Sequence, residues 1–111
     1  MQWGLQILPD AVVVRIFGLS DHSLGEMFEK AAERAMSLEN RKVLVDFSHV
    51  ESMGPIELTF CAYGLYHLQQ LGIPVALIQP PASLLPVLCR HGMKKFPTVF
   101  SHEYDLSLIH I

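Results

Sequence analysis

Histidine, cysteine and carboxylate side chains are the groups of this chain best suited to bind a metal or to carry out nucleophilic and acid–base chemistry. No two histidines have the His-x-x-x-His spacing of a helical metal site, and no Cys/His cluster has ligand spacing. His49 and Glu51 are close in sequence, but two ligands do not complete a site. The sequence therefore predicts no metal and no cofactor. The six histidines are scattered along the 111 residues, at His22, His49, His67, His91, His102 and His110.

The two cysteines, Cys61 and Cys89, are the candidate nucleophiles. A reactive cysteine needs a neighbouring base and a group that orients this base, whereas each of these cysteines lies in an apolar, helix-like run. We therefore expect two reduced, packed thiols and no enzyme activity. Because the first eight residues lack the basic start and the long apolar middle of a signal peptide, we expect the protein in the cytoplasm.

Positive charge is concentrated in one segment, where Arg90, Lys94 and Lys95 follow a predicted short helix. These three residues are candidates for an anion contact, including contact with the phosphates of a nucleotide. The alternative is a structural role, because cations near the C-terminus of a helix complement its dipole. The chain has no glycine-rich phosphate loop that would support a nucleotide site.

Composition and charge restrict the class of partner. Half of the residues are hydrophobic, which is enough for one domain over residues 1–111 to bury a core without disulfides or a metal. The formal net charge of −3 argues against nucleic acid as the partner, because phosphate chains require a clustered positive surface. No stretch approaches the roughly 20 apolar residues that cross a bilayer, so we expect no direct membrane insertion.

The elements that must position these residues follow from the hydrophobic pattern. A hairpin followed by alternating strands and helices predicts an α/β fold, in which a mixed sheet of about four to five strands packs with about four helices. The predicted order is β-β-α-β-α-β-α-β-α. Strands are expected over 2–8, 11–17, 42–47, 75–78 and 98–100, and helices over 23–37, 55–71, 82–91 and 101–106.

The first helix has a capping box, since Ser23 and Glu26 have the Ser-x-x-Glu spacing in which each side chain reaches the other residue's backbone N–H. Its apolar positions share one face, and we interpret its charged face as a solvated surface. Pro55 fits the first turn of the second helix, and Gly72 is suited to follow its end.

The second helix is apolar on two faces. One stripe is expected to face the sheet, and it consists of Leu58, Cys61, Ala62, Leu65 and Leu68. The opposite face is predicted to bind a partner, because exposed aromatic patches mark interaction sites. The alternative is that the preceding loop or the C-terminal tail covers it. This face consists of Ile56, Thr59, Phe60, Tyr63 and His67, with Tyr66 beside it.

Several stretches resemble the STAS family, which includes anti-sigma factor antagonists and the cytoplasmic domains of sulfate transporters. The segment Val43-Leu44-Val45-Asp46-Phe47-Ser48-His49-Val50 is similar to the family's "vvlDlsgV". The helix end Leu68-Gln69-Gln70-Leu71-Gly72 is similar to "l..lG", and residues 84–103 are similar to the family's C-terminal pattern. Gly18 fits the family's first glycine. The resemblance implies a STAS-like fold and a non-catalytic, regulatory role.

The chain departs from the family at the start of the second helix. Many STAS members have Asp-Ser-Ser-Gly there, and a partner kinase phosphorylates the first serine. An ungapped alignment places Gly54, Pro55, Ile56 and Glu57 at this motif, so the phosphorylatable hydroxyl is absent. A second alignment, which needs a gap on each side, places Glu51-Ser52-Met53-Gly54 there and retains Ser52. We prefer the ungapped alignment, which also keeps Met53 in register.

Glu57 then supplies a fixed negative charge in the helical turn where the family has a phosphate. One interpretation is a variant that binds its partner regardless of kinase state, and the other is a first-turn glutamate that stabilises its own helix.

Three hypotheses for function remain. The first is a regulatory interaction module that binds a kinase, an anti-sigma-like regulator, another STAS protein or a second copy of itself. The second is a domain that senses a nucleotide or a lipid, and the third is a STAS subunit of a transport system.

Overall fold

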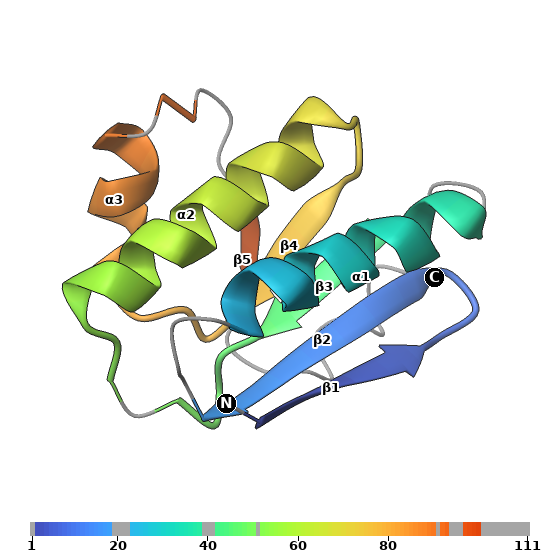
Figure 1. The fold of residues 1–111 in the computed structure, drawn as a ribbon, viewed down its shortest axis with the longest axis horizontal. Helices are drawn as coiled ribbons and strands as arrows, with labels where there is room; N and C mark the ends of the chain where they lie inside the picture. Colours follow the sequence, from blue (N-terminus) through green and yellow to red (C-terminus); the bar gives the residue numbers. More distant parts are fainter. Residues whose placement is uncertain are drawn as a thin grey trace.

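The structure, a computed structural model, describes residues 2–18, 23–38, 42–50, 52–90, 92–93 and 97–100. These residues form a five-stranded sheet with the strand order β1-β2-β3-β4-β5, and two long helices lie side by side along one face of it (Figure 1). The strands are β1 (Gln2–Ile7), β2 (Ala11–Gly18), β3 (Lys42–Asp46), β4 (Val75–Ile78) and β5 (Thr98–Phe100). The helices are α1 (Ser23–Ser37), α2 (Pro55–Gln70) and α3 (Leu84–Arg90).

The sheet is mixed, as predicted. Strands β1 and β2 form an antiparallel hairpin, and β2, β3, β4 and β5 run parallel to one another. The predicted α/β class and the order of these eight elements are confirmed. Two details differ. The third helix begins at Leu84 rather than at residue 82, because the Leu84 N–H first closes a turn onto the Pro81 carbonyl. The predicted fourth helix, over residues 101–106, lies outside the described residues.

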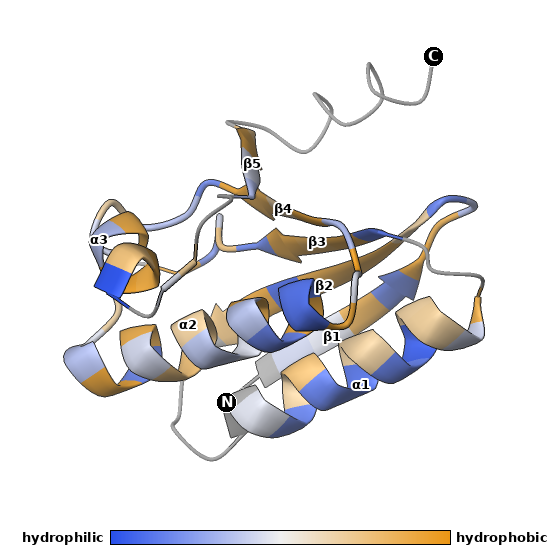
Figure 2. Cartoon of the chain, turned by 90° about the horizontal axis from the view of Figure 1, so that it is seen from above, coloured by the Kyte–Doolittle hydropathy of each residue, from blue (hydrophilic) through white to orange (hydrophobic). Residues whose placement is uncertain are grey.

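The main core lies between the sheet and the two long helices. Alternate residues of the strands point to this side, among them Val12, Val14 and Val45. The helix stripe that was expected to face the sheet is buried here, which confirms that part of the prediction. Figure 2 shows the hydrophobic surfaces of α1 and α2 turned toward the strands, with the hydrophilic surface of α1 turned away.

Close contact between α1 and α2 depends on Gly64. A Cβ atom added at this position would overlap the ring of Phe28, which is buried between the two helices. The two helices therefore pack closely at the point where α2 has no side chain.

The other face of the sheet has a smaller apolar cluster, composed of Ala11, Val13, Leu44, Ala76 and Ile78, with Leu8 and Phe100 packed against it. The alternation of β2 and β3 puts Arg15 and Asp46 on this same face. Within the described ranges, no helix is both long enough and apolar enough to span a bilayer.

Candidate functional site

The N-terminus of α2 has no side-chain cap. Gly54 precedes the helix in an extended conformation, with φ −77° and ψ 172°, and Pro55 occupies the first turn, where its missing N–H costs nothing. The first helical bond runs from the Leu58 N–H to the Gly54 carbonyl, over 3.0 Å. The Thr59 hydroxyl donates to the Pro55 carbonyl at 2.9 Å, so it is engaged within the helix.

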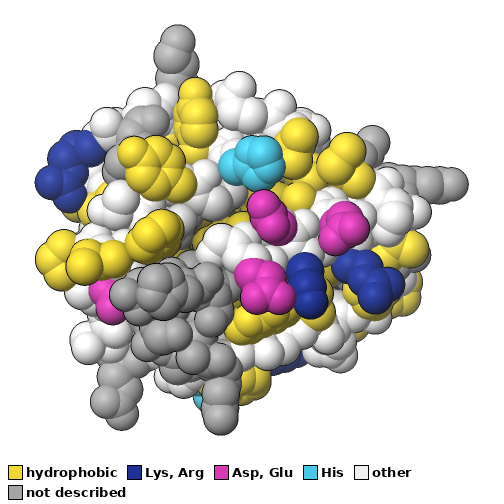
Figure 3. Space-filling model, viewed as in Figure 1, with side chains coloured by type: hydrophobic (Ala, Val, Ile, Leu, Met, Phe, Trp, Pro, Cys, Tyr) yellow, Lys and Arg dark blue, Asp and Glu magenta, His cyan; other side chains and the backbone are white. Residues whose placement is uncertain are grey.

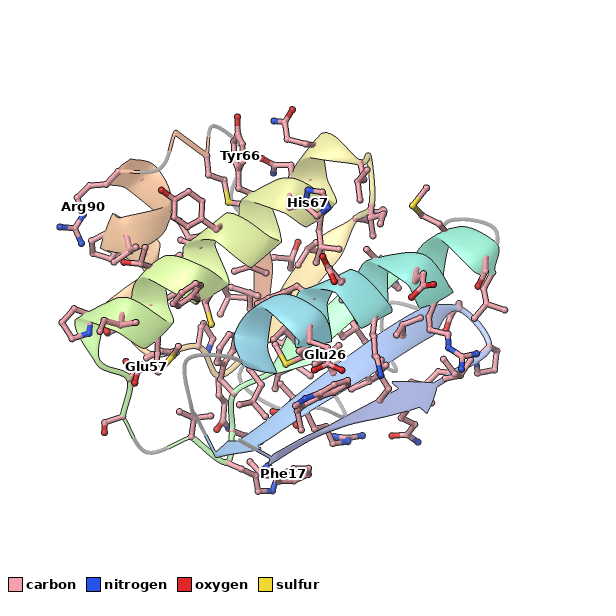
Figure 4. The ribbon with its side chains drawn as sticks, viewed as in Figure 1. Phe17, Glu26, Glu57, Tyr66, His67 and Arg90 are labelled. Carbon is pink, nitrogen blue, oxygen red and sulfur yellow. The ribbon has the colours of Figure 1, made fainter. Side chains whose placement is uncertain are left out.

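The Glu57 side chain folds back over this helix start. A Cβ atom added at Gly54 would lie 2.6 Å from Glu57 Oε2, which places the carboxylate directly beside the first backbone unit of the helix. Figure 4 shows Glu57 at the end of α2 where the helix begins. Unpaired N–H groups and the helix dipole favour an anion at this point. The chain's own carboxylate already supplies that anion.

Ser52, the hydroxyl retained by the gapped alignment, lies before the helix in a segment without regular secondary structure, and its side chain is exposed. It is accessible, but it is outside the helical turn that Pro55 occupies. Glu51 lies outside the described residues. The preference for the ungapped alignment therefore stays a prediction.

The outer face of α2 carries an uncovered apolar stripe. Ile56 and Tyr63 are each 58% exposed, and Phe60 is 43% exposed. These residues are four and three positions apart, so they lie in one line along the helix, and exposed His67 continues the line. We call these four residues the α2 stripe. The exposed fractions show that the loop before the helix does not cover it.

Thr59 and Tyr66, which were predicted on or beside this face, are half-buried, and Tyr66 packs against the core. Figure 3 shows hydrophobic side chains gathered over α2, with the charged side chains of α1 next to them. Those charged side chains are exposed, as predicted for a solvated surface, and Glu26 pairs with Lys30 at 3.4 Å.

Helix α3 borders the α2 stripe on the side away from α1. Its residues Leu85, Cys89 and Arg90 are exposed, and Figure 4 shows the Arg90 side chain on the side of α3 that is turned away from α2. Lys94 and Lys95 lie outside the described residues. The anion contact predicted for these three cations therefore remains a prediction, with Arg90 accessible for it.

Phe17 and His49 form an aromatic contact that sequence reasoning missed. Their ring centroids are 5.1 Å apart and the rings are tilted by 55°. Both side chains are exposed, and His49 Nδ1 also lies 3.2 Å from Ser48 Oγ. Phe17 is near the end of β2, and His49 follows the end of β3, from which the chain continues to α2. Neighbouring parallel strands end on the same side of a sheet, so an aromatic residue at each of these two strand ends was the sequence signal that could have predicted the contact.

Asp46 anchors the loop that leads to α2. Its side chain is buried, and Oδ2 accepts a charged hydrogen bond from Arg15 at 3.1 Å. Oδ1 accepts from the Ser48 backbone N–H at 2.9 Å, which holds the first turn of the loop. Arg15 also donates to Gln6 Oε1 at 2.7 Å. This network joins β1, β2 and β3 to the segment before the helix.

The two cysteines differ in environment. Burial, with a smaller contribution from the Glu57 carboxylate, raises the pKa of the Cys61 thiol from 9.0 to about 12. Cys89 is exposed, so the prediction that both thiols are packed is wrong for Cys89. In this short helix the inward positions are Leu84, Val87 and Leu88, and a rotation of about 100° per residue turns position 89 to solvent.

A hollow of about 350 Å³ lies at the opposite end of α2 from the stripe's first residue. Its described lining is mostly apolar and consists of Leu65, Gln69, Gly72, Ile73, Pro74, Val75, Met93, Pro97 and Thr98. Arg90 is not among these lining residues. Across the described part of the chain, no three His, Cys, Asp or Glu side chains are grouped so that they could hold a metal.

No protein-family model and no curated protein sequence matches the chain. Solved structures do match. A serine-to-glutamate variant of RsbS from Moorella thermoacetica is 17% identical, with a TM-score of 0.71 over 99% of this chain and 96% of that one. The unphosphorylated form of SpoIIAA, an anti-sigma factor antagonist, is 15% identical, with a TM-score of 0.68 over 98% of this chain and 96% of that one.

A chain of the stressosome, described as a signal integration and transduction hub, is 17% identical, with a TM-score of 0.72 over 96% of both chains. Another SpoIIAA structure, of the Bacillus cell fate determinant, is of the phosphorylated form. These likenesses confirm the STAS-like fold that the sequence resemblance predicted.

Proposed function

We propose that this protein is a non-catalytic regulatory module that docks to another protein through the α2 stripe and the helix start beside it. The observation that carries the proposal is the exposure of Ile56, Phe60 and Tyr63 in one line on a helix whose opposite face is fully packed. Large aromatic side chains that become buried at an interface contribute most of its binding free energy.

The likeness to SpoIIAA and to the stressosome chain supports the same class of function. The expected partner is a protein of a regulatory system, such as a kinase, an anti-sigma-like regulator or another STAS protein. The chemistry of the stripe calls for a partner with an apolar groove that accepts aromatic side chains.

Docking in this protein is proposed to be independent of phosphorylation. Under the ungapped alignment Pro55 replaces the hydroxyl, and the Glu57 carboxylate lies at the helix start. A phosphate added nearby would meet a like charge, which disfavours it. The proposed module is therefore permanently in one docking state.

The experiment is capture of the regulatory partner from native lysate by the wild-type chain and by a Phe60→Ser/Tyr63→Ser variant, with intact-mass analysis of the recovered protein. Because both rings are exposed, we expect the variant to stay folded and to lose at least about tenfold in affinity, as expected when two aromatic contacts of roughly 1 kcal/mol each are removed. A Met36→Ser variant is the matched control, since Met36 is 53% exposed on α1.

Three outcomes contradict parts of the proposal. If the double variant unfolds, the rings belong to the core. If it captures the partner as well as the Met36→Ser control does, the stripe is not the docking surface. A phosphate on Ser52 in the recovered wild-type protein would show that the gapped alignment is correct and that docking is switched.

A further inference from the structure

Strand β1 is an open edge of the sheet. It pairs with β2 on one side, and it is the terminal strand in the order of the described strands (Figure 1). Natural edge strands usually carry charges, prolines or bulges that prevent pairing with another chain. The register of β1 against β2 shifts between Gln2 and Trp3, at the start of the strand. From Trp3 to Ile7 the strand has no charged residue and no proline, and its register is unbroken.

The hairpin hydrogen bonds show which backbone groups of β1 point outward. The Leu8 N–H donates to the Ala11 carbonyl at 2.8 Å, so residues 8 and 11 form a hydrogen-bonded pair. Bonded and non-bonded pairs alternate in an antiparallel ladder. Gly4 and Gln6 therefore bond to β2, whereas the N–H and C=O groups of Trp3, Leu5 and Ile7 point away from it. Among the described residues, none bonds to these outward groups.

The three residues whose backbone groups point to the open edge, Trp3, Leu5 and Ile7, also have apolar side chains. Trp3 and Leu5 are half-buried against the main core, and Ile7 on the same side is 44% exposed. Trp3 and Leu5 open into a hollow of about 540 Å³, whose other wall is the side of α1 that carries Lys30, Glu33, Arg34 and Ser37. An apolar strand edge is thus bordered by a wall with charges of both signs.

We propose that β1 pairs with β1 of a second copy of this chain, antiparallel and centred on Leu5, to form a continuous ten-stranded sheet across a two-fold axis. This register places Trp3 opposite Ile7 of the second copy and Leu5 opposite its own counterpart. All the outward N–H and C=O groups of Trp3, Leu5 and Ile7 then find partners.

A second copy fits this edge because the edge is self-complementary. The apolar residues at 3, 5 and 7 are symmetric about position 5, so a two-fold axis matches apolar with apolar on the helix side of the sheet. The α1 wall carries both cations and an anion, so it does not present a charge of one sign to its symmetry-related copy. The α2 stripe is not involved, because α2 packs over β4 on the far side of α1.

The test combines sedimentation equilibrium with hydrogen exchange followed by NMR. We expect the wild type to be a dimer, and an Ile7→Lys variant to dimerise about tenfold or more weakly, because lysine is a residue that natural proteins use to block edges. Val99→Lys is the matched control, since Val99 is 48% exposed on β5 at the opposite edge, and it should remain dimeric. The Phe60→Ser/Tyr63→Ser variant should also remain dimeric.

Hydrogen exchange supplies an internal control within the strand. In the dimer the amides of Trp3 and Leu5 should exchange slowly, and in Ile7→Lys they should exchange fast, while those of Gly4 and Gln6 stay protected in both.

Trp3 is the sole tryptophan, so its fluorescence emission should shift to longer wavelength when the wild type is diluted to monomer. A wild type that is monomeric at NMR concentration, or a dimer with fast exchange at Trp3 and Leu5, would overturn the proposal. So would dissociation by Val99→Lys without dissociation by Ile7→Lys.

Discussion

The Glu57 carboxylate and the Cys61 thiol lie one turn apart on α2, and the charge of the first raises the pKa of the second. A cysteine in the first turn of a helix is often activated by the dipole. Cys61 lies further along the helix and is buried, so desolvation dominates and the thiol stays protonated. The chemically accessible thiol of the two is therefore Cys89.

The raised pKa of Cys61 predicts a loss of stability at high pH. In the unfolded chain this thiol ionises near pH 9.0, whereas in the folded chain it stays protonated up to about pH 12. Between these values the unfolded state binds fewer protons, so the free energy of unfolding falls as pH rises. Urea unfolding below and within this window should show a steeper fall for the wild type than for Cys61→Ala. Parallel curves for the two proteins would show that Cys61 is not the cause.

Among the polar residues that the structure describes, Asp46 is the one whose substitution is expected to lower the free energy of unfolding most. Replacement of Asp46 by Ala leaves the Arg15 guanidinium without its carboxylate and the Ser48 N–H without its acceptor. Loss of one partner of a fully buried ion pair costs about 3 kcal/mol or more. Arg15 is partly exposed and keeps its bond to Gln6, so we expect a smaller cost, about 2 kcal/mol. Urea unfolding measures this cost, and Asp46→Asn, which keeps an acceptor oxygen, should cost less.

A double-mutant cycle with Arg15→Ala separates the ion pair from the loop contact. If Asp46→Ala loses equal stability with or without Arg15, the ion pair contributes nothing and the loop contact carries the whole effect.

The packing of α1 against α2 leaves no room for a side chain at Gly64. Alanine is normally the better helix former by about 1 kcal/mol. At Gly64 the added methyl group would overlap the buried ring of Phe28, so the packing of α1 against α2 must give way.

Two glycines in helices therefore predict opposite outcomes. Gly64→Ala should destabilise the protein by about 2 kcal/mol, because overpacking exceeds the gain in helix propensity. Gly25→Ala in α1 should stabilise it by about 0.5–1 kcal/mol, since a Cβ atom there meets nothing within 4 Å. Thermal or urea unfolding measures both. A Gly64→Ala variant as stable as the wild type would mean that α1 and α2 can separate at no cost.

Across the whole molecule, the features predicted from sequence are those encoded within a single element or between neighbours in the chain. The short gap between the predicted strands over 2–8 and 11–17 indicated a hairpin, and the two faces of α2 followed from helical periodicity alone. The exposure of the α2 stripe did not follow from periodicity alone, because the preceding loop or the C-terminal tail was the alternative cover for this face. The exposed fractions of its side chains come from the structure.

The features that sequence reasoning missed depend on where separate elements meet. The contact of Phe17 with His49 requires the order and direction of β2 and β3, and the need for Gly64 requires the distance between two helices. Cys89 was predicted to be buried because it lies in an apolar run. It is exposed, because a short helix can bury only one of its sides. Such facts are absent from any local pattern.

The carboxylate over Gly54 also has a consequence for how this protein can evolve. Every proline codon becomes a serine codon by one base change at its first position, so a hydroxyl at position 55 is a single mutation away. If docking is independent of phosphorylation, as proposed under the ungapped alignment, that mutation alone would not create a phosphorylation switch, because Glu57 already supplies a negative charge at the helix start where the new phosphate would have to sit. On this proposal a switch requires a second substitution at Glu57, and until both substitutions occur the first confers no advantage through phosphorylation.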